Sequence, residues 1–141
     1  MERISRSMAA VAASVAAASL LAGCGGSDLD EECAAAFERA ALTVDRVDSA
    51  EYECGGSFGN PSQDGKIVLG VDTQEEATPV IEEIYKAFAT NDGLDGAWSP
   101  GTEFVARGGG ASFDDLGLEF NGSPSVGDMR DRYDVHPPST D

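Results

Sequence analysis

Hydrophobic residues recur every three or four positions from residue 29 onward, which is the spacing of one face of a helix. Ser27 or Asp28 suits the amino-terminal cap, and the pattern ends near Thr43. Charged residues fall largely outside this apolar face. The pattern therefore predicts a first amphipathic helix, whose apolar positions are Leu29, Cys33, Phe37, Ala40 and Val44.

After Val44 the hydrophobic period shortens towards two, as in a half-buried strand. Residues 55–65 are rich in Gly, Pro and short polar side chains, which predicts a turn-rich connection. A second strand is predicted over Lys66–Asp72. The core-facing positions of the two strands are Ala50, Tyr52, Cys54, Ile67, Leu69 and Val71, and those of the first alternate with Ser49, Glu51 and Glu53.

A second helix is predicted after Thr73, which can form a capping box with Glu76. Glu82 and Lys86 have the spacing of an ion pair on its exposed side, and Gly93 suits its carboxyl-terminal cap. Its apolar stripe consists of Ala77, Ile81, Ile84 and Phe88.

The start of this second helix stays open at the level of sequence. Pro79 would remove a hydrogen bond from a helix that begins at Gln74. If Thr78 is the cap instead, Pro79 is the first residue of the helix, where proline is well tolerated.

The remainder of the chain predicts two more strands and a short helix. Thr102–Arg107 is a strand, paired across Pro100-Gly101 with residues around Trp98, and Gly108–Gly110 form a mobile loop. Leu116, Leu118 and Phe120 alternate with polar or small residues, which indicates another strand. Ser125 with Asp128 caps a last helix that carries Val126, Met129 and Tyr133.

The predicted order is helix, strand, strand, helix, strand, strand, helix. Connections of hairpin length on both sides of the central helix favour an antiparallel sheet with helices on one face. We therefore predict an α+β fold, in which a small antiparallel sheet of about four strands is covered by two to three helices.

The first residues have the three parts of an export signal. Arg3 and Arg6 give a positive start, and residues 8–22 contain no charge. At about 1.5 Å per residue, this run is too short as a helix to cross a hydrocarbon core of roughly 30 Å. It ends in Leu21-Ala22-Gly23-Cys24, which resembles the lipobox of bacterial lipoproteins.

The lipobox resemblance implies that the thiol of Cys24 receives a diacylglyceryl group and that the chain is then cut before this residue. Two acyl chains hold a protein on a bilayer where one would dissociate. The expected organisation is a signal peptide over 1–23, a lipidated tether over 24–28, a single domain over 29–135 and a flexible tail over 136–141. The expected location is the extracytoplasmic face of the cell membrane, or an outer membrane. The order of elements also resembles that of small actinobacterial lipoproteins.

The chain is strongly acidic. It has 26 acidic and 9 basic residues, and loss of Glu2, Arg3 and Arg6 with the signal peptide leaves a net charge of −18. Such a surface disfavours binding of nucleic acid or anionic lipid headgroups. It favours solubility, cationic partners, or an environment rich in divalent ions.

Besides Cys24, the chain contains only Cys33 and Cys54. An even pair of cysteines in a small exported domain is most simply a disulfide. It would join the first helix to the core face of the first strand and stabilise the fold by roughly 3 kcal/mol. No histidine or further cysteine lies close enough in sequence to favour a metal site instead.

Four segments resemble chemical motifs and lack parts of them. Residues 55–59 match G-x-S-x-G around Ser57, but the single histidine, His136, lies in the predicted tail. Residues 91–96 resemble a calcium loop without its third and twelfth ligands. Asp114-Asp115 and Glu75-Glu76 are adjacent pairs that are better explained as solvated carboxylates. We therefore predict no catalytic residues, no metal site and no cofactor.

Trp98 is the most prominent remaining candidate. Its ring either presents an aromatic face to a partner or closes an edge of the core. The sequence favours a non-enzymatic lipoprotein that binds or accompanies an envelope protein. The alternatives are a small envelope hydrolase and a carrier of divalent ions or small ligands.

Overall fold

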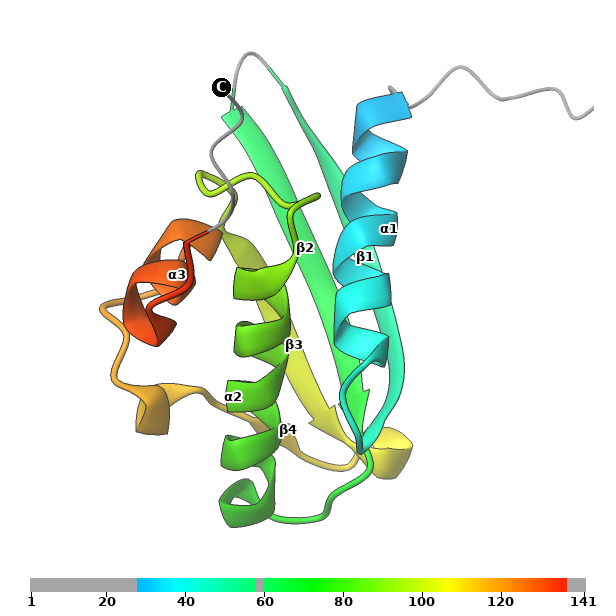
Figure 1. Ribbon diagram of the computed structural model, residues 1–141. Helices are drawn as coiled ribbons and strands as arrows, with labels where there is room; N and C mark the ends of the chain where they lie inside the picture. Colours follow the sequence, from blue (N-terminus) through cyan, green and yellow to red (C-terminus); the bar gives the residue numbers. More distant parts are fainter. Residues whose placement is uncertain (1–27, 58–59, 137–141) are drawn as a thin grey trace, which may run out of the picture.

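The computed structural model describes residues 28–57 and 60–136, and it shows three helices on one face of a four-stranded sheet (Figure 1). This confirms the predicted α+β class, the number of strands and the helices on a single face. The helices are α1 (Asp28–Leu42), α2 (Gln74–Thr90) and α3 (Val126–Tyr133), and the strands are β1 (Val47–Ser57), β2 (Asn60–Leu69), β3 (Pro100–Ala106) and β4 (Ser112–Phe113).

The sheet is mixed, which corrects the prediction that it is antiparallel throughout. Its strand order is β1-β2-β3-β4. β1 pairs antiparallel with β2 and β3 pairs antiparallel with β4, whereas β2 and β3 are parallel. The reason is the connection between β2 and β3, which passes through α2. The helix carries the chain back to the end of the sheet where β2 begins, so β3 runs in the same direction as β2.

The hairpin of β1 and β2 is longer than predicted, because most of residues 55–65 belongs to strands. Cys54 pairs with Gln63 and Gly56 with Pro61. Gly65 is required in this hairpin, since a Cβ atom there would overlap the ring of Tyr52, its partner on β1. Gly65 thus marks a close contact between β1 and β2, and Pro61 lies at the start of β2.

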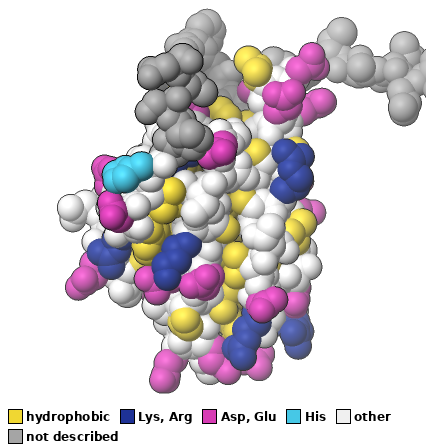
Figure 2. Space-filling model, viewed as in Figure 1, with side chains coloured by type: hydrophobic (Ala, Val, Ile, Leu, Met, Phe, Trp, Pro, Cys, Tyr) yellow, Lys and Arg dark blue, Asp and Glu magenta, His cyan; other side chains and the backbone are white. Residues whose placement is uncertain are grey.

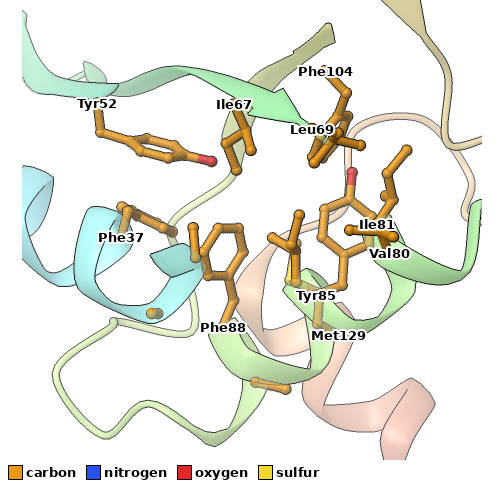
Figure 3. Close-up of a cluster of buried hydrophobic side chains, with 14 of the residues drawn as sticks. Phe37, Tyr52, Ile67, Leu69, Val80, Ile81, Tyr85, Phe88, Phe104 and Met129 are labelled. Carbon is orange, nitrogen blue, oxygen red and sulfur yellow. The ribbon is translucent and has the colours of Figure 1, made fainter. Parts of the chain in front are cut away.

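The core lies between the sheet and the helices and is rich in aromatic rings (Figure 3). Phe37 of α1 stacks on Tyr52 at 5.0 Å between ring centroids and meets Phe88 of α2 edge-on at 5.1 Å. The predicted stripe of α2 is buried in full, with Ile81, Ile84 and Phe88 at 0% exposure. Leu29 is wrong as a core residue of α1, because it is 72% exposed in the first turn.

α2 begins at Gln74, which decides between the two predicted starts. Thr73 is the cap: its hydroxyl accepts from the backbone N–H of Glu76, whose carboxylate accepts in return from Asp72 N–H and the Thr73 hydroxyl. Pro79 therefore lies inside the helix, on its exposed side. Asn91, not Gly93, is the carboxyl-terminal cap.

The segment after β3 differs most from the prediction. Leu116, Leu118 and Phe120 form no strand: a 3-10 turn covers Leu116–Leu118, and Glu119 then adopts a left-handed backbone with φ of 59°. β3 pairs with β2 and β4, so the predicted pairing with residues around Trp98 is wrong as well.

α3 forms as predicted. Ser125 and Asp128 make a reciprocal capping box, and Val126 and Met129 are fully buried. Arg130 ties this helix to the end of α2, because its guanidinium donates to the carbonyl oxygens of Asn91 and Leu94 at 3.0 and 2.8 Å. His136 is exposed, and the rest of the predicted tail, 137–141, lies outside the described residues.

Candidate functional site

An open groove of about 740 Å³ lies between the turn that follows α1 and one side of α2. We call it the α2 groove. Hydrophobic side chains reach the surface along the middle of the face shown in Figure 2, with charged side chains on both sides of them. The residues that line the α2 groove are Thr43, Val44, Asp45, Arg46, Glu76, Pro79, Val80, Glu83, Lys86, Ala87 and Thr90.

The helical repeat of α2 explains this composition. While Ala77, Ile81, Ile84 and Phe88 point into the core, positions one residue away from this stripe lie on its flank. Val80 and Ala87 supply the apolar floor of the groove from that flank. Pro79, Glu83 and Thr90 extend it towards solvent.

Arg46 occupies the rim of the groove in an unusual backbone conformation, with φ of 69°. A left-handed conformation is unfavourable for a residue with a long side chain, by roughly 1 kcal/mol or more. It is held in place because the carbonyl of Arg46 accepts a hydrogen bond of 2.7 Å from Gly70 N–H at the end of β2. The fold thus fixes the chain at the point where Arg46 enters the groove.

The rim of the groove carries charges of both signs. Lys86 Nζ lies 3.3 Å from Glu83 Oε1 and 5.5 Å from the ring centroid of Tyr133. The partner of Lys86 is therefore Glu83, and the predicted partner, Glu82, is wrong. The pKa of Glu76 lies below its usual range, first because Asp72 N–H and the Thr73 hydroxyl donate to its carboxylate, and to a smaller extent because Arg46 is near. A ligand with an apolar body and charged ends matches this arrangement.

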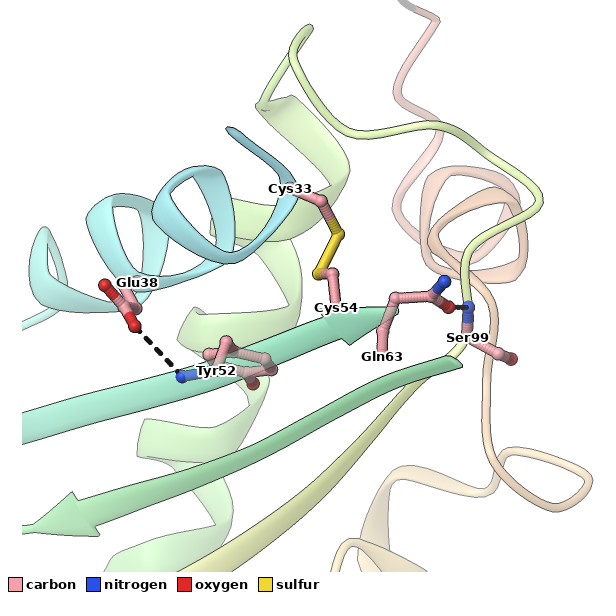
Figure 4. Close-up of a disulfide and its surroundings, with 6 residues drawn as sticks. All are labelled: Cys33, Glu38, Tyr52, Cys54, Gln63 and Ser99. Carbon is pink, nitrogen blue, oxygen red and sulfur yellow. Dashed lines mark hydrogen bonds between the residues drawn. A yellow bond between two sulfur atoms is a disulfide. The ribbon is translucent and has the colours of Figure 1, made fainter. Parts of the chain in front are cut away.

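The predicted disulfide between Cys33 and Cys54 is present (Figure 4). It joins α1 to β1, with 6.0 Å between the two Cα atoms. Cys33 is buried and Cys54 is half-buried.

Trp98 is half-buried and packs against the core, at 6.1 Å from the ring centroid of Phe37. Its backbone carbonyl accepts from Val126 N–H at 2.8 Å, which connects it to α3. The structure therefore confirms that Trp98 closes an edge of the core. A contact between its exposed part and a partner stays a prediction.

The two carboxylates of Asp114 and Asp115 serve different parts of the chain. Asp115 Oδ2 accepts from the phenol of Tyr85 at 2.6 Å, and Asp114 Oδ1 accepts from Leu116 N–H. Burial raises the pKa of the Tyr85 phenol, and the bond to Asp115 with its negative charge raises it further. Asp115 thus holds the 3-10 turn onto α2.

The calcium-like segment uses its oxygen ligands internally. Asn91 Oδ1 accepts from Gly93 N–H, and Asp95 Oδ1 accepts from Ala97 N–H, both at 2.8 Å. Within residues 28–57 and 60–136, no three His, Cys, Asp or Glu side chains gather closely enough to hold a metal ion.

The G-x-S-x-G segment ends β1 at Ser57, and its last two residues lie outside the described part of the chain. His136 Nε2 lies 3.0 Å from Asp134 Oδ1 at the exposed end of α3. Cys24 and the signal-like segment also fall outside the described residues. In the part of the chain that the structure describes, no helix has the length and hydrophobicity needed to cross a bilayer.

No family model, no curated protein and no solved structure matches this chain.

Sequence reasoning did not identify the α2 groove. One signal was available: Val80 and Ala87 extend the apolar surface of α2 beyond a stripe that already suffices for the core. The position of Arg46 had no local signal, because its backbone conformation depends on the distant Gly70.

Proposed function

We propose that this protein is a lipid-anchored module on the extracytoplasmic face of the cell membrane, which binds an envelope protein through the α2 groove. The observation that carries the binding part is the groove itself, with its apolar floor from Val80 and Ala87 and its charged rim. A surface that is apolar at its centre and polar around it is typical of protein interfaces.

Three features support the location. The lipobox-like Leu21-Ala22-Gly23-Cys24 follows an uncharged segment at the usual distance. The Cys33–Cys54 disulfide is typical of proteins that fold outside the reducing cytoplasm. Without residues 1–23 the net charge is −18, which favours solubility of the domain beside a membrane.

The replacement Cys24→Ser is expected to abolish attachment to the membrane. Serine has no thiol to receive the lipid, and without acyl chains nothing of comparable affinity retains the domain. We would measure lipid labelling with a fatty-acid analogue and the distribution of the protein between membrane and soluble fractions. The expected result is loss of the label, with the protein released or left uncleaved. Unchanged labelling and membrane retention would contradict the anchor.

The groove is tested by Pro79→Arg combined with Thr90→Arg. Pro79 and Thr90 are exposed residues that line the α2 groove, so two arginine side chains there would obstruct it and add two positive charges. We expect crosslinking in the native cell, followed by affinity capture and mass spectrometry, to recover one dominant envelope protein with the unchanged chain. The double variant should recover it at least about tenfold less, since a lost interface core costs more than 1.4 kcal/mol.

Asn121→Arg with Ser112→Arg is the matched control, because it adds the same charge at exposed positions outside the groove and away from Trp98 in sequence. A second control keeps residues 1–27 and lacks the domain. The proposal fails if the two double variants lose the partner equally, or if the full chain captures nothing beyond the anchor-only control.

A further inference from the structure

The outer edge of the sheet at β1 carries backbone groups that no strand pairs in the described part of the chain. Among the described residues, β1 is the first strand in the sheet order and pairs only with β2. The backbone N–H of Tyr52 points away from β2, because it donates to Glu38 Oε1 of α1 at 3.0 Å (Figure 4). In an antiparallel pair this direction alternates, so the peptide groups of Ala50 and Cys54 also point away from β2.

This edge borders a hollow of about 550 Å³ that is strongly acidic. Among the residues that the structure describes, four carboxylates and one ammonium group line it. Glu51 and Glu53 are exposed beside the unpaired edge. The hollow is lined by Glu38, Glu51, Tyr52, Glu53, Asp64, Gly65 and Lys66.

We infer that the β1 edge binds an extended basic segment of a partner protein, which adds to the sheet as a further strand beside β1. Strand addition of this kind takes its affinity from main-chain hydrogen bonds and its specificity from alternate side chains. Lysine or arginine at every second position of the segment would face Glu51 and Glu53. This surface is separate from the α2 groove and shares no residue with it.

The contact between Glu38 and Tyr52 must open before a further strand can pair with β1. An incoming strand must place a carbonyl where the Glu38 carboxylate now accepts the N–H of Tyr52. The displaced carboxylate is half-buried and returns to water, while the carbonyl of the segment takes its place on the Tyr52 N–H. The preference for a basic segment therefore rests on Glu51 and Glu53.

The same charges exclude a second copy of this chain as the occupant. Pairing two β1 edges would bring Glu51 and Glu53 of one chain towards those of the other, and each chain has a net charge of −17. Like charges directly opposite one another destabilise strand pairing. Acidic residues beside an open edge are a common protection against such self-association.

Synthetic peptides test the inference directly. We would titrate a fluorescent peptide of about eight residues, with alternating lysine and valine, into the detergent-purified full chain and follow its anisotropy. A lysine–proline peptide has the same charge but cannot donate main-chain hydrogen bonds at the proline positions. The lysine–valine peptide is expected to bind at least about tenfold more tightly than the lysine–proline and glutamate–valine peptides. Equal binding of both lysine peptides would overturn strand addition and leave only general charge attraction.

Variants of the protein locate the binding at β1. Ala50→Pro removes an N–H that points away from β2, so it costs the sheet no hydrogen bond and is tolerated on an edge strand. This variant should lower the affinity for the lysine–valine peptide at least about tenfold. The double variant Glu51→Gln with Glu53→Gln is a second test that does not alter the backbone. Both side chains are exposed, so the fold should be kept, and peptide binding should weaken about five- to tenfold.

Glu75→Gln with Asp92→Asn removes the same two charges at exposed positions away from the hollow. This control is expected to bind the lysine–valine peptide like the unchanged protein. An equal loss of affinity in both pairs of variants would overturn the assignment to β1. Because the assay uses no membrane and no envelope partner, its failure would leave the crosslinking result on the α2 groove unaffected, and the reverse also holds.

Discussion

Replacement of Phe37 by alanine is expected to lower the free energy of unfolding by about 3–5 kcal/mol. Phe37 is fully buried, and its ring lies 5.0 Å from Tyr52 of β1 and 5.1 Å from Phe88 of α2. One side chain therefore joins two helices and the sheet. Small domains have a total stability of about 5–15 kcal/mol, so this single change should remove a large share of it.

Urea denaturation at neutral pH, followed by circular dichroism, would measure this loss as a lower midpoint. Leu29→Ala is the control on the same helix, because Leu29 is 72% exposed although its spacing places it on the apolar stripe. It should change the stability by no more than about 0.5 kcal/mol. A loss for Leu29→Ala as large as that for Phe37→Ala would contradict the described position of α1.

The elements that sequence predicts well have local causes. α3 begins where Ser125 and Asp128 satisfy each other's backbone groups, and such a capping box needs only four consecutive residues. α1 ends at Leu42, one residue before the predicted boundary. The alternation of Tyr52 and Cys54 with Glu51 and Glu53 correctly identifies the buried face of β1.

The elements that sequence misses depend on distant contacts. Leu116, Leu118 and Phe120 have the alternation of a strand, yet the bond between Tyr85 and Asp115 fixes the start of this segment on α2. The parallel pairing of β2 and β3 has no local signal, because it is set by where α2 packs. The buried amide of Gln63 contributes to that placement, since its oxygen accepts from Ser99 N–H just before β3 (Figure 4).

The candidate surfaces also divide into features with a local sequence signal and features that depend on distant contacts. The disulfide follows from the count of cysteines. The sequence also predicts that Trp98 either closes an edge of the core or contacts a partner. The α2 groove requires the turn at Arg46 and the flank of α2 to meet, and the β1 edge requires the sheet order. Neither arrangement can be derived from spacing within one segment.

α1 links these features, because it supplies both Cys33 and Glu38. The disulfide attaches the first part of the helix to Cys54, and Glu38 reaches Tyr52 two residues away on the same strand. The position of Glu38 at the β1 edge therefore depends on how firmly α1 is held against β1.

Removal of the disulfide, by Cys33→Ala with Cys54→Ala, is expected to lower the free energy of unfolding by roughly 3 kcal/mol. The two cysteines are 21 residues apart, and the crosslink restricts the unfolded chain over that loop. Urea denaturation with and without reductant would measure the effect. Reductant should destabilise the unchanged protein by a similar amount and leave the double variant unaffected, which separates the loss of the bond from any packing defect caused by alanine.

The same variant should also loosen the contact at the β1 edge. With α1 no longer tied to β1, the Glu38 carboxylate spends less time on Tyr52 N–H, and hydrogen exchange at that amide is expected to accelerate about tenfold or more. Exchange at buried Ile67 of β2, which lies inside the sheet, should follow only the global loss of stability. If the Tyr52 and Ile67 amides accelerate by the same factor, the disulfide stabilises the fold as a whole and does not control the position of Glu38.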